Sequence, residues 1–331
     1  GQIGPFSLSS GIVQSGHLAQ NAIISGNIAA KAVGSGSVAS ELSLVHFAPT
    51  GMTTFAKQNN FRIGLLSGVA ITATDTTGVG VYLNPYNGTG ISLWDTTTSG
   101  WLSMYASGNA IFNNPNTITS GVIYDVFAYN NSSVIALQVV SWSGSARSST
   151  APIVSWQGVP VWSGQPANRL VGTIMADSST TFSDTFTKRF VQNVDNRVQR
   201  PMYYADSTSH TYNVGAGGVP VGTFRIWNNN SGAQLMWVNG TSGTAHGLGL
   251  WTSLARTAGT GGYAKISLAT NNTLSDNPLI LTTSNTTDYR AGTLSAAQSQ
   301  IGYNYAYPQE TMTASGTISA VDVRVTGYME G

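Results

Sequence analysis

The chain has 331 residues, of which 41% are hydrophobic and 10% aromatic, a composition that excludes general disorder and allows more than one globular domain. Charged residues make up only 8%, against roughly 25% in an average soluble domain, and the formal net charge is +1. This balance predicts no nucleic-acid partner, and no apolar run is long enough to predict membrane insertion. The absence of cysteine excludes disulfides and thiolate metal sites.

The N-terminal segment carries an aliphatic residue at every fifth position, within pentads that read approximately Gly-x-[Ile/Leu/Val]-x-Ser. A step of five matches neither the period of a helix nor that of a strand, so it indicates a repeat architecture. The eight aliphatic positions are Ile3, Leu8, Val13, Leu18, Ile23, Ile28, Val33 and Val38.

Eight pentads cannot bury this aliphatic row by themselves. Wound as a square coil, they would stand about 10 Å tall, with fewer coils than the three or so that a solenoid needs; extended, they would reach about 130 Å. We therefore expect residues 1–42 to form an attachment and oligomerisation segment, whose aliphatic row is buried against copies of itself or against another protein. The alternative is a flexible leader with an accidental period.

Residues 43–200 contain short segments of strand type, separated by turn residues, and no long amphipathic helix. The pair Asn87-Gly88 predicts a hairpin between residues 81–85 and 91–94. Further strands are expected at residues 101–105, 124–129, 134–140, 153–156, 159–162 and 170–175. This spacing predicts a first domain that is an antiparallel β-sandwich.

Residues 187–201 interrupt the strand pattern and hold four of the 14 basic residues of the chain. These four are Lys188, Arg189, Arg197 and Arg200. We interpret this basic seam as a junction between two domains, in which guanidinium groups bond backbone carbonyls or the carboxylates of Asp184 and Asp195. Phosphate binding is the alternative, and the near-zero net charge favours the structural role.

Residues 201–331 repeat the strand pattern and predict a second, distal domain. Strands are expected at residues 221–227, 233–238, 248–254, 264–269, 279–283, 303–307 and 321–325, and a short helix at residues 294–300. The sequence thus predicts an all-β protein, in which the pentad segment precedes two antiparallel, jelly-roll-like β-sandwich domains.

Several motifs, in this order, resemble the surface fibre and tail proteins of tailed bacteriophages. They are Tyr82-Leu83-Asn84-Pro85-Tyr86-Asn87-Gly88, Tyr124-Asp125-Val126-Phe127-Ala128-Tyr129, Val154-Ser155-Trp156-Gln157-Gly158-Val159, Arg169-Leu170-Val171-Gly172-Thr173-Ile174, Lys188-Arg189-Phe190, Asn196-Arg197-Val198 and Arg200-Pro201-Met202. Pentads such as Ser15-Gly16-His17-Leu18-Ala19 are similar to leaders of phage structural proteins. The resemblance covers roughly residues 10 to 202, and more loosely the C-terminal domain, and it departs in the seam, where Gln192, Val194 and Asp195 stand in place of a more aromatic run.

The resemblance implies a virion surface protein that is made in the host cytoplasm and carried on the extracellular particle. It implies a homotrimer, attached to a phage capsid or tail protein by the N-terminal segment, with β domains that face outward. It brings no catalytic residues and no cofactor.

No constellation in the sequence itself predicts catalysis or metal binding. The four histidines are scattered, and no Gly-x-Ser-x-Gly motif occurs, so we expect no metal and no cofactor. Cleavage of a glycan would require two facing carboxylates. Asp184 with Asp195, or Asp276 with Asp288, would be the candidates, and nothing in the sequence favours them over surface acids.

Aromatic residues of the distal domain are candidates for stacking on a host-surface glycan, although most are expected in the core or in a subunit interface. These candidates are Trp227, Trp237, Trp251, Tyr303 and Tyr305. Three functions remain open: a homotrimeric fibre or spike for host attachment, a capsid decoration or cement protein without a receptor, and a glycan-degrading tailspike.

Overall fold

The computed structural model describes residues 58–106, 110–113, 118–147, 152–215, 220–258, 264–271, 273–274, 279–281, 288–293 and 297–331. The chain divides into two compact units, Gly1–Met52 and Thr53–Gly331, and all of these residues belong to the second unit. The predicted pentad segment lies outside the described residues. Within them the regular structure is strand, apart from the 3₁₀ turn η5 (Trp227–Asn229), which confirms the all-β prediction. The described part contains no helix long and apolar enough to cross a membrane.

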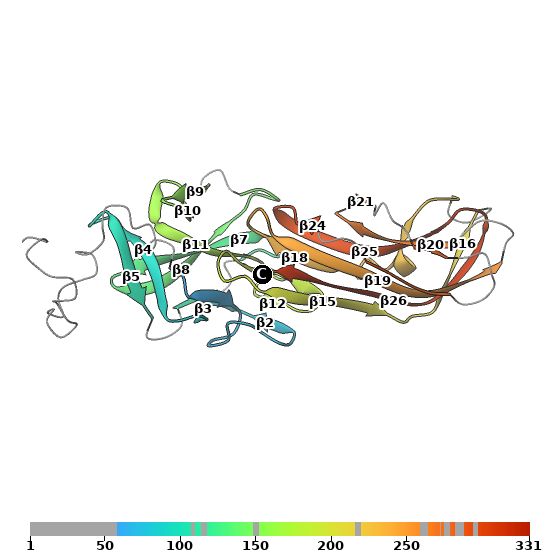
Figure 1. Cartoon of the computed structure of the whole chain (residues 1–331), viewed down its shortest axis with the longest axis horizontal. Helices are drawn as coiled ribbons and strands as arrows, with labels where there is room; N and C mark the ends of the chain where they lie inside the picture. The colour runs from blue at the N-terminus through green and yellow to red at the C-terminus, as the bar shows by residue number, and fades with distance from the viewer. Residues whose placement is uncertain are drawn as a thin grey trace, which may run out of the picture. The chain divides into compact units, whose positions relative to one another are not determined.

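The first half of the described chain forms strands that enclose one hydrophobic core, here called the first sandwich. Its strands are β1 (Phe61–Gly64), β2 (Thr76–Gly78), β3 (Gly80–Pro85), β4 (Gly90–Asp95), β5 (Gly100–Tyr105), β6 (Ala110–Asn113), β7 (Ile123–Asn131), β8 (Val134–Ser141), β9 (Ile153–Trp156), β10 (Val159–Trp162), β11 (Gln165–Met175), β12 (Phe182–Asp184), β13 (Lys188–Arg189) and β14 (Val191–Asn193). One sheet has the order β8-β7-β11-β10-β9, with β14 paired to β11; a second has the order β1-β3-β6, and β4 and β5 form a hairpin (Figure 1).

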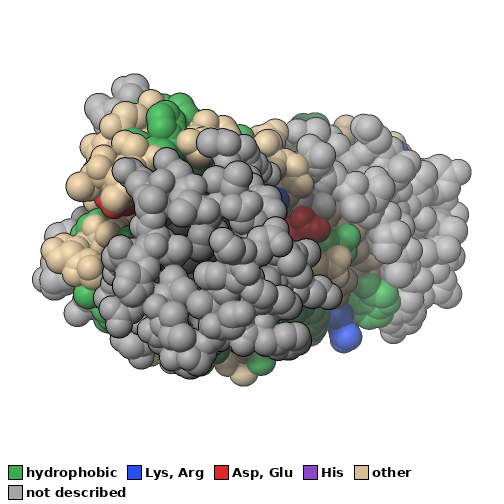
Figure 2. All heavy atoms as spheres, turned by 60° about the vertical axis from the view of Figure 1, so that its left-hand side comes forward, with side chains coloured by type: hydrophobic (Ala, Val, Ile, Leu, Met, Phe, Trp, Pro, Cys, Tyr) green, Lys and Arg blue, Asp and Glu red, His purple; other side chains and the backbone are tan. Residues whose placement is uncertain are grey.

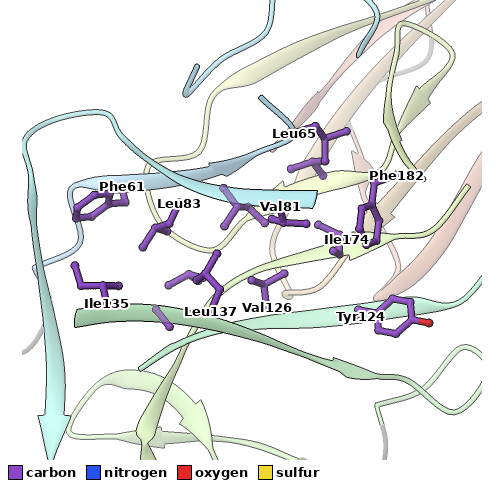
Figure 3. Packing of buried hydrophobic residues seen from close by; sticks show 14 of the residues in the cluster. Phe61, Leu65, Val81, Leu83, Tyr124, Val126, Ile135, Leu137, Ile174 and Phe182 are labelled. Carbon is purple, nitrogen blue, oxygen red and sulfur yellow. The ribbon is translucent and has the colours of Figure 1, made fainter. Parts of the chain in front are cut away.

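The core of the first sandwich forms because alternate side chains of each strand face the same side. Phe61 on β1 and Leu83 on β3 are 1% and 0% exposed. Figure 3 shows them directed toward Ile135 and Leu137 on β8, which belong to the same buried cluster. Full burial of each such side chain contributes about 1.5–3 kcal/mol to folding, so this cluster is the main source of stability in this half.

The second half forms the second sandwich, from two sheets packed face to face around another core. Its strands are β15 (Gln199–Asp206), β16 (His210–Val214), β17 (Arg225–Ile226), β18 (Leu235–Asn239), β19 (Ala245–Ala258), β20 (Ala264–Thr270), β21 (Thr273–Leu274), β22 (Leu279–Leu281), β23 (Asp288–Thr293), β24 (Ala297–Gln298), β25 (Gly302–Met312) and β26 (Gly316–Glu330). One sheet has the order β15-β26-β19-β23, and the other contains β18-β25-β20-β21. Met312 and Val325, from opposite sheets, are both fully buried between them.

The sheet that contains β18 continues into the first half of the chain. Its full order is β2-β12-β13-β18-β25-β20-β21, and β13 and β18 pair in parallel, with Lys188 opposite Met236 and Arg189 opposite Trp237. The two largest hydrophobic clusters, in contrast, span residues 61–191 and 202–329, and a small cluster of Ile123, Trp142 and Val238 joins the two halves. The predicted boundary after residue 200 therefore falls between two cores, while backbone pairing crosses it.

Two local predictions are wrong for reasons that the pairing explains. Asn87-Gly88 does not close a hairpin, because β3 pairs with β1 and β6, whereas β4 pairs with β5. The turn instead bonds Asn60, whose carbonyl accepts from the N–H groups of Tyr86 and Asn87. The helix expected at residues 294–300 is replaced, where the structure describes it, by β24, which pairs with β19. Cross-strand hydrogen bonds override a weak local helix preference.

Candidate functional site

The basic seam is built around one buried carboxylate. Asp184 on β12 accepts hydrogen bonds from Arg189 at 3.1 Å and from Arg200 at 2.8 Å, and all three side chains are at most 5% exposed. Arg189 also donates to the carbonyl of Pro201 at 2.9 Å. Buried charges of this kind are tolerated only when they are paired, so the three side chains depend on one another.

Two further arginines, which the sequence analysis did not assign to the seam, reach the same region from the first sandwich. Arg62 on β1 is 1% exposed and donates to the backbone oxygen of Gly331 at 2.7 Å and to that of Asn196. Burial lowers the pKa of Arg62 to about 10, so the side chain stays charged at neutral pH and needs these acceptors. Arg169 on β11 pairs with Asp195 at 3.1 Å.

The two remaining cations of the basic seam also have partners inside the protein. Lys188 pairs with Asp177 at 2.7 Å, and both side chains are about one-third exposed. Arg197 donates to the hydroxyl of Thr241 at 2.7 Å and to the carbonyl of Val194 at 3.2 Å. All four predicted seam cations are thus engaged within the chain, in an arrangement that suits a structural junction better than phosphate binding.

A buried amide network crosses from the seam to the second sandwich. Gln192 on β14 donates through Nε2 to Asn239 and to Thr244, each at 3.0 Å, and its Oε1 accepts from the N–H of Gly240 at 2.7 Å. Gln192 and Asn239 are fully buried. Here the protein uses hydrogen-bonded amides where the phage resemblance led us to expect aromatic packing. A satisfied buried network favours one arrangement of the two sandwiches over others.

The structure distributes the predicted glycan contacts over different surfaces. Trp227 and Trp237 are 0% exposed in the core of the second sandwich, so neither ring is accessible to a ligand, and both take the core role that the sequence analysis also allowed. Trp251 on β19 is partly exposed and lies beneath the guanidinium of Arg324, which is 4.9 Å from the ring centre. It belongs to a different sheet from the tyrosines.

Tyr303 and Tyr305 are half-buried on β25 and form a row with Tyr307. Their ring centres are 5.6 Å and 5.8 Å apart along the row. Burial raises the pKa of Tyr303 to about 12, and its ring also contacts that of Phe190 in the seam at 6.4 Å. The five candidates therefore do not converge on one site.

The aromatic surface that the sequence analysis missed is the tryptophan cluster, formed by Trp94, Trp101 and Trp156. Trp94 and Trp101 are directly opposite in the β4–β5 hairpin, and their ring centres are 5.6 Å apart; Trp156 on β9 lies 5.5 Å from Trp94. Both contacts are edge-to-face. Trp156 is 39% exposed, and Val159 and Val161 pack beneath Trp101. The available signal was the placement of Trp94 and Trp101 at the facing ends of the strands expected at residues 91–94 and 101–105.

Two turns border the tryptophan cluster and fix its polar edge. Gln157 has a φ of 50° in the β9–β10 turn, and its Oε1 accepts from Nε1 of Trp101 at 2.9 Å. Asp95, at the end of β4, accepts from the N–H of Thr97 and from the hydroxyl of Thr98, each at 2.9 Å. The hydrogen bond from the Thr97 backbone, followed by that from Thr98, lowers the pKa of Asp95. The hydrogen bond to Gln157 thus fixes the ring of Trp101, and those from Thr97 and Thr98 fix the carboxylate of Asp95.

The first pair of carboxylates considered for glycan cleavage, Asp184 and Asp195, is not a pair of free acids. Asp184 is held by two buried arginines, and Asp195 by Arg169 and the side chain of Asn59. Asp276 lies outside the described residues. Among the residues that the structure does describe, no group of three side chains is placed to hold a metal ion.

One more ionic group lies inside the second sandwich. The carboxylate of Glu310 on β25 is 0% exposed and accepts from Arg225 at 2.8 Å, and Nε2 of His210 lies 3.1 Å from both of its oxygens. His210 belongs to the sheet of β26, whereas Arg225 pairs with β25, so the group links the two sheets. Its position between the sheets indicates a structural role.

No protein-family model matches the chain, and no curated protein matches it. Among solved structures, a family 35 carbohydrate-binding module from Clostridium thermocellum is 16% identical, with 38% of this chain and 97% of that chain covered and a TM-score of 0.20. Latent PorU from Porphyromonas gingivalis is 10% identical, with 82% and 24% covered and a TM-score of 0.22. The isomalto-dextranase of Arthrobacter globiformis T6, complexed with panose, is 12% identical, with 66% and 34% covered and a TM-score of 0.20. The chain spans only part of the latter two proteins, and likenesses this weak carry no argument about function.

Proposed function

We propose that this protein is a non-enzymatic structural protein of a tailed-phage virion, a homotrimeric fibre or spike on the particle surface. Its N-terminal pentads hold the copies together and attach them to a capsid or tail protein. Its two sandwiches project outward and attach the particle to the host surface. The phage-like motifs and the aliphatic row of the pentads support this role from the sequence.

The structural observation that supports the proposal most is the joint between the two sandwiches. Neighbouring domains of one chain move relative to each other by default unless their interface is extensive. Here β13 and β18 belong to one sheet, Asp184 binds two buried arginines, and Gln192 bonds the second sandwich directly. A projecting protein needs such a joint, because an attached host pulls on its outer part.

The surface chemistry supports contact with uncharged polar ligands. Figure 2 shows one face of the molecule, on which the coloured side chains are mostly hydrophobic or uncharged and few are charged. Each contact with such a ligand is weak, and several copies on a fibre and many fibres on a particle turn weak contacts into firm attachment.

Immunolabelling of intact particles tests the proposal. An antibody against residues 203–331 should label the virion in electron micrographs. Label at one vertex would identify a tail fibre or spike, label spread over the shell would identify a head fibre or decoration protein, and particles without label would contradict the virion role. Analytical ultracentrifugation of the purified chain at micromolar concentration should show a trimer, and a stable monomer would remove that part of the proposal.

The burial of Trp227 and Trp237 favours a second candidate, a capsid decoration or cement protein without a receptor role, because it removes two of the distal glycan contacts. Deletion of residues 1–40 should abolish attachment to the particle under both proposals. The fibre proposal alone predicts that the purified chain binds host cells and competes with infection. Absence of both effects would leave the decoration role.

A further inference from the structure

We propose that the tryptophan cluster is a carbohydrate-binding site for a neutral oligosaccharide of hexopyranose rings. This inference deepens the attachment role and rests on it for its biological purpose. It places the sugar contact on the first sandwich, on the β4–β5 and β9–β10 hairpins, whereas the sequence analysis sought it on the second.

The exposed ring surface is of the size that a sugar needs. Trp156 is 39% exposed, which for a tryptophan leaves roughly 100 Å² accessible. Trp101 adds a smaller part, and Trp94 is only 9% exposed. A stable protein interface buries about 800 Å² on each partner, so the cluster alone is too small for a second copy of the chain. One face of a pyranose carries C–H groups and its rim carries hydroxyls, which matches an aromatic face with acceptors beside it.

The cluster is held in place before any ligand arrives. Gln157 has a φ of 50°, in the left-handed region that costs a residue with a side chain about 1–2 kcal/mol. Asparagine or glycine usually occupies this position of a two-residue hairpin turn. Only a longer side chain reaches Nε1 of Trp101, so the strained glutamine is explained by the hydrogen bond that fixes this ring.

Ser99, in the neighbouring β4–β5 turn, also has a left-handed φ, of 51°. Strained residues of this kind gather at ligand sites, where the surrounding structure maintains them. Fixing aromatic rings in advance lowers the entropic cost of binding, which matters most for a small ligand with few contacts.

The polar edge of the cluster favours a neutral ligand. In residues 94–101 and 156–159, the segments that bear and border the three rings, Asp95 is the single charged residue, and the others are threonine, serine, glycine, tryptophan, glutamine and valine. No cation is present there to hold an acidic sugar. The Asp95 carboxylate follows Trp94 in the chain and is held by the N–H of Thr97 and the hydroxyl of Thr98.

The test is titration of the full chain with neutral hexasaccharides of β-1,4-glucan, β-1,3-glucan, β-1,4-mannan and α-1,6-glucan, followed by tryptophan fluorescence and calorimetry. At least one should bind, and Trp156→Ala should weaken that binding about tenfold or more. Tyr203→Ala is the matched control, since Tyr203 is an exposed aromatic residue, at 44%, on the second sandwich.

Gln157→Asn separates binding from folding. Asparagine suits the left-handed turn and is too short to hold Trp101, so this variant should be at least as stable as the wild type and should bind the sugar several-fold more weakly. Unchanged affinity in Gln157→Asn would remove the positioning role of this side chain and with it the argument from the strained turn.

Three results would overturn the proposal: no binding of any of the four probes, an equal loss in Tyr203→Ala, or dissociation of the oligomer by Trp156→Ala without sugar binding by the wild type. The last would make the cluster part of a contact between copies. Particles without immunolabel would refute the virion role and leave the sugar site standing, so the two failures are distinguishable.

Discussion

Replacing Asp184 with asparagine tests whether the buried ionic group holds the two sandwiches together. The substitution keeps the shape of the side chain and removes the charge that Arg189 and Arg200 share at 3.1 Å and 2.8 Å. Burial and the charge of Arg200 lower the pKa of Arg189, and Asp184 opposes both effects. Removing one partner from a buried ion pair costs about 3–5 kcal/mol, and we expect Asp184→Asn to lower the free energy of unfolding by that amount.

Urea unfolding and calorimetry measure this effect. In a folded unit of this size, each kcal/mol corresponds to about 2–4 °C, so the melting temperature should fall by roughly 6–20 °C. Asp322→Asn is the control, because its partner Arg324 is 52% exposed and such pairs contribute about 1 kcal/mol or less. A loss below about 1 kcal/mol in Asp184→Asn would refute the reasoning that the ionic group stabilises the joint.

Three further predictions concern other buried positions. Gly172→Ala would place a Cβ 2.6 Å from the backbone oxygen of Gln192 and should cost about 1–3 kcal/mol in urea unfolding, whereas Gly100→Ala, whose Cβ would meet nothing closer than 3.8 Å, should cost nothing measurable. Burial lowers the pKa of His246, so the folded protein favours the neutral ring. Above the unfolded pKa of about 6.5 the neutral ring does not reduce the free energy of unfolding, and below it the free energy of unfolding falls, because the unfolded chain binds the proton more readily. Between pH 7 and pH 5, the unfolding free energy of His246→Gln should therefore fall less steeply than that of the wild type, and equal slopes would contradict the assignment. Glu310→Gln removes a carboxylate that is 0% exposed from its partners Arg225 and His210 and should cost about 3–5 kcal/mol, and a thermal shift no larger than that of an exposed acid would count against it.

Strand positions could be predicted from the sequence because alternation and turn residues are local, but strand partners could not. The turn at Gln157-Gly158 joins neighbours in the sheet, whereas Asn87-Gly88 carries equally good turn residues and joins strands of different sheets. The difference lies in β1 and β6, which take both edges of β3. The residues of the turn do not show which distant strand will pair with β3, so the strand order could not be predicted from them.

In the candidate sites, too, the sequence shows which residue types are present but not which distant side chains come together. The dense basic residues of the seam were visible as a group, whereas Arg62 and Arg169 are single cations inside strands, and only the packing of β1 and β11 brings them to the seam. Trp237 stands between Met236 and Val238 and is 0% exposed, whereas Trp156 stands between Ser155 and Gln157 and is 39% exposed. The sequence does not show which sheet covers each ring: a second sheet covers Trp237, and Trp156 lies on an edge strand.

The pairing of β15 with β26 puts Gln199 directly opposite Glu330. The backbone therefore leaves the first sandwich on β15 and returns to it on the adjacent strand β26, so the whole second sandwich is inserted between two neighbouring points. Such a segment could be exchanged as one piece of the gene. An unrelated domain whose ends meet on adjacent strands could fit the same junction only if it offered β13 a matching edge and gave Asp184 and Gln192 new partners in place of Arg200 and Asn239.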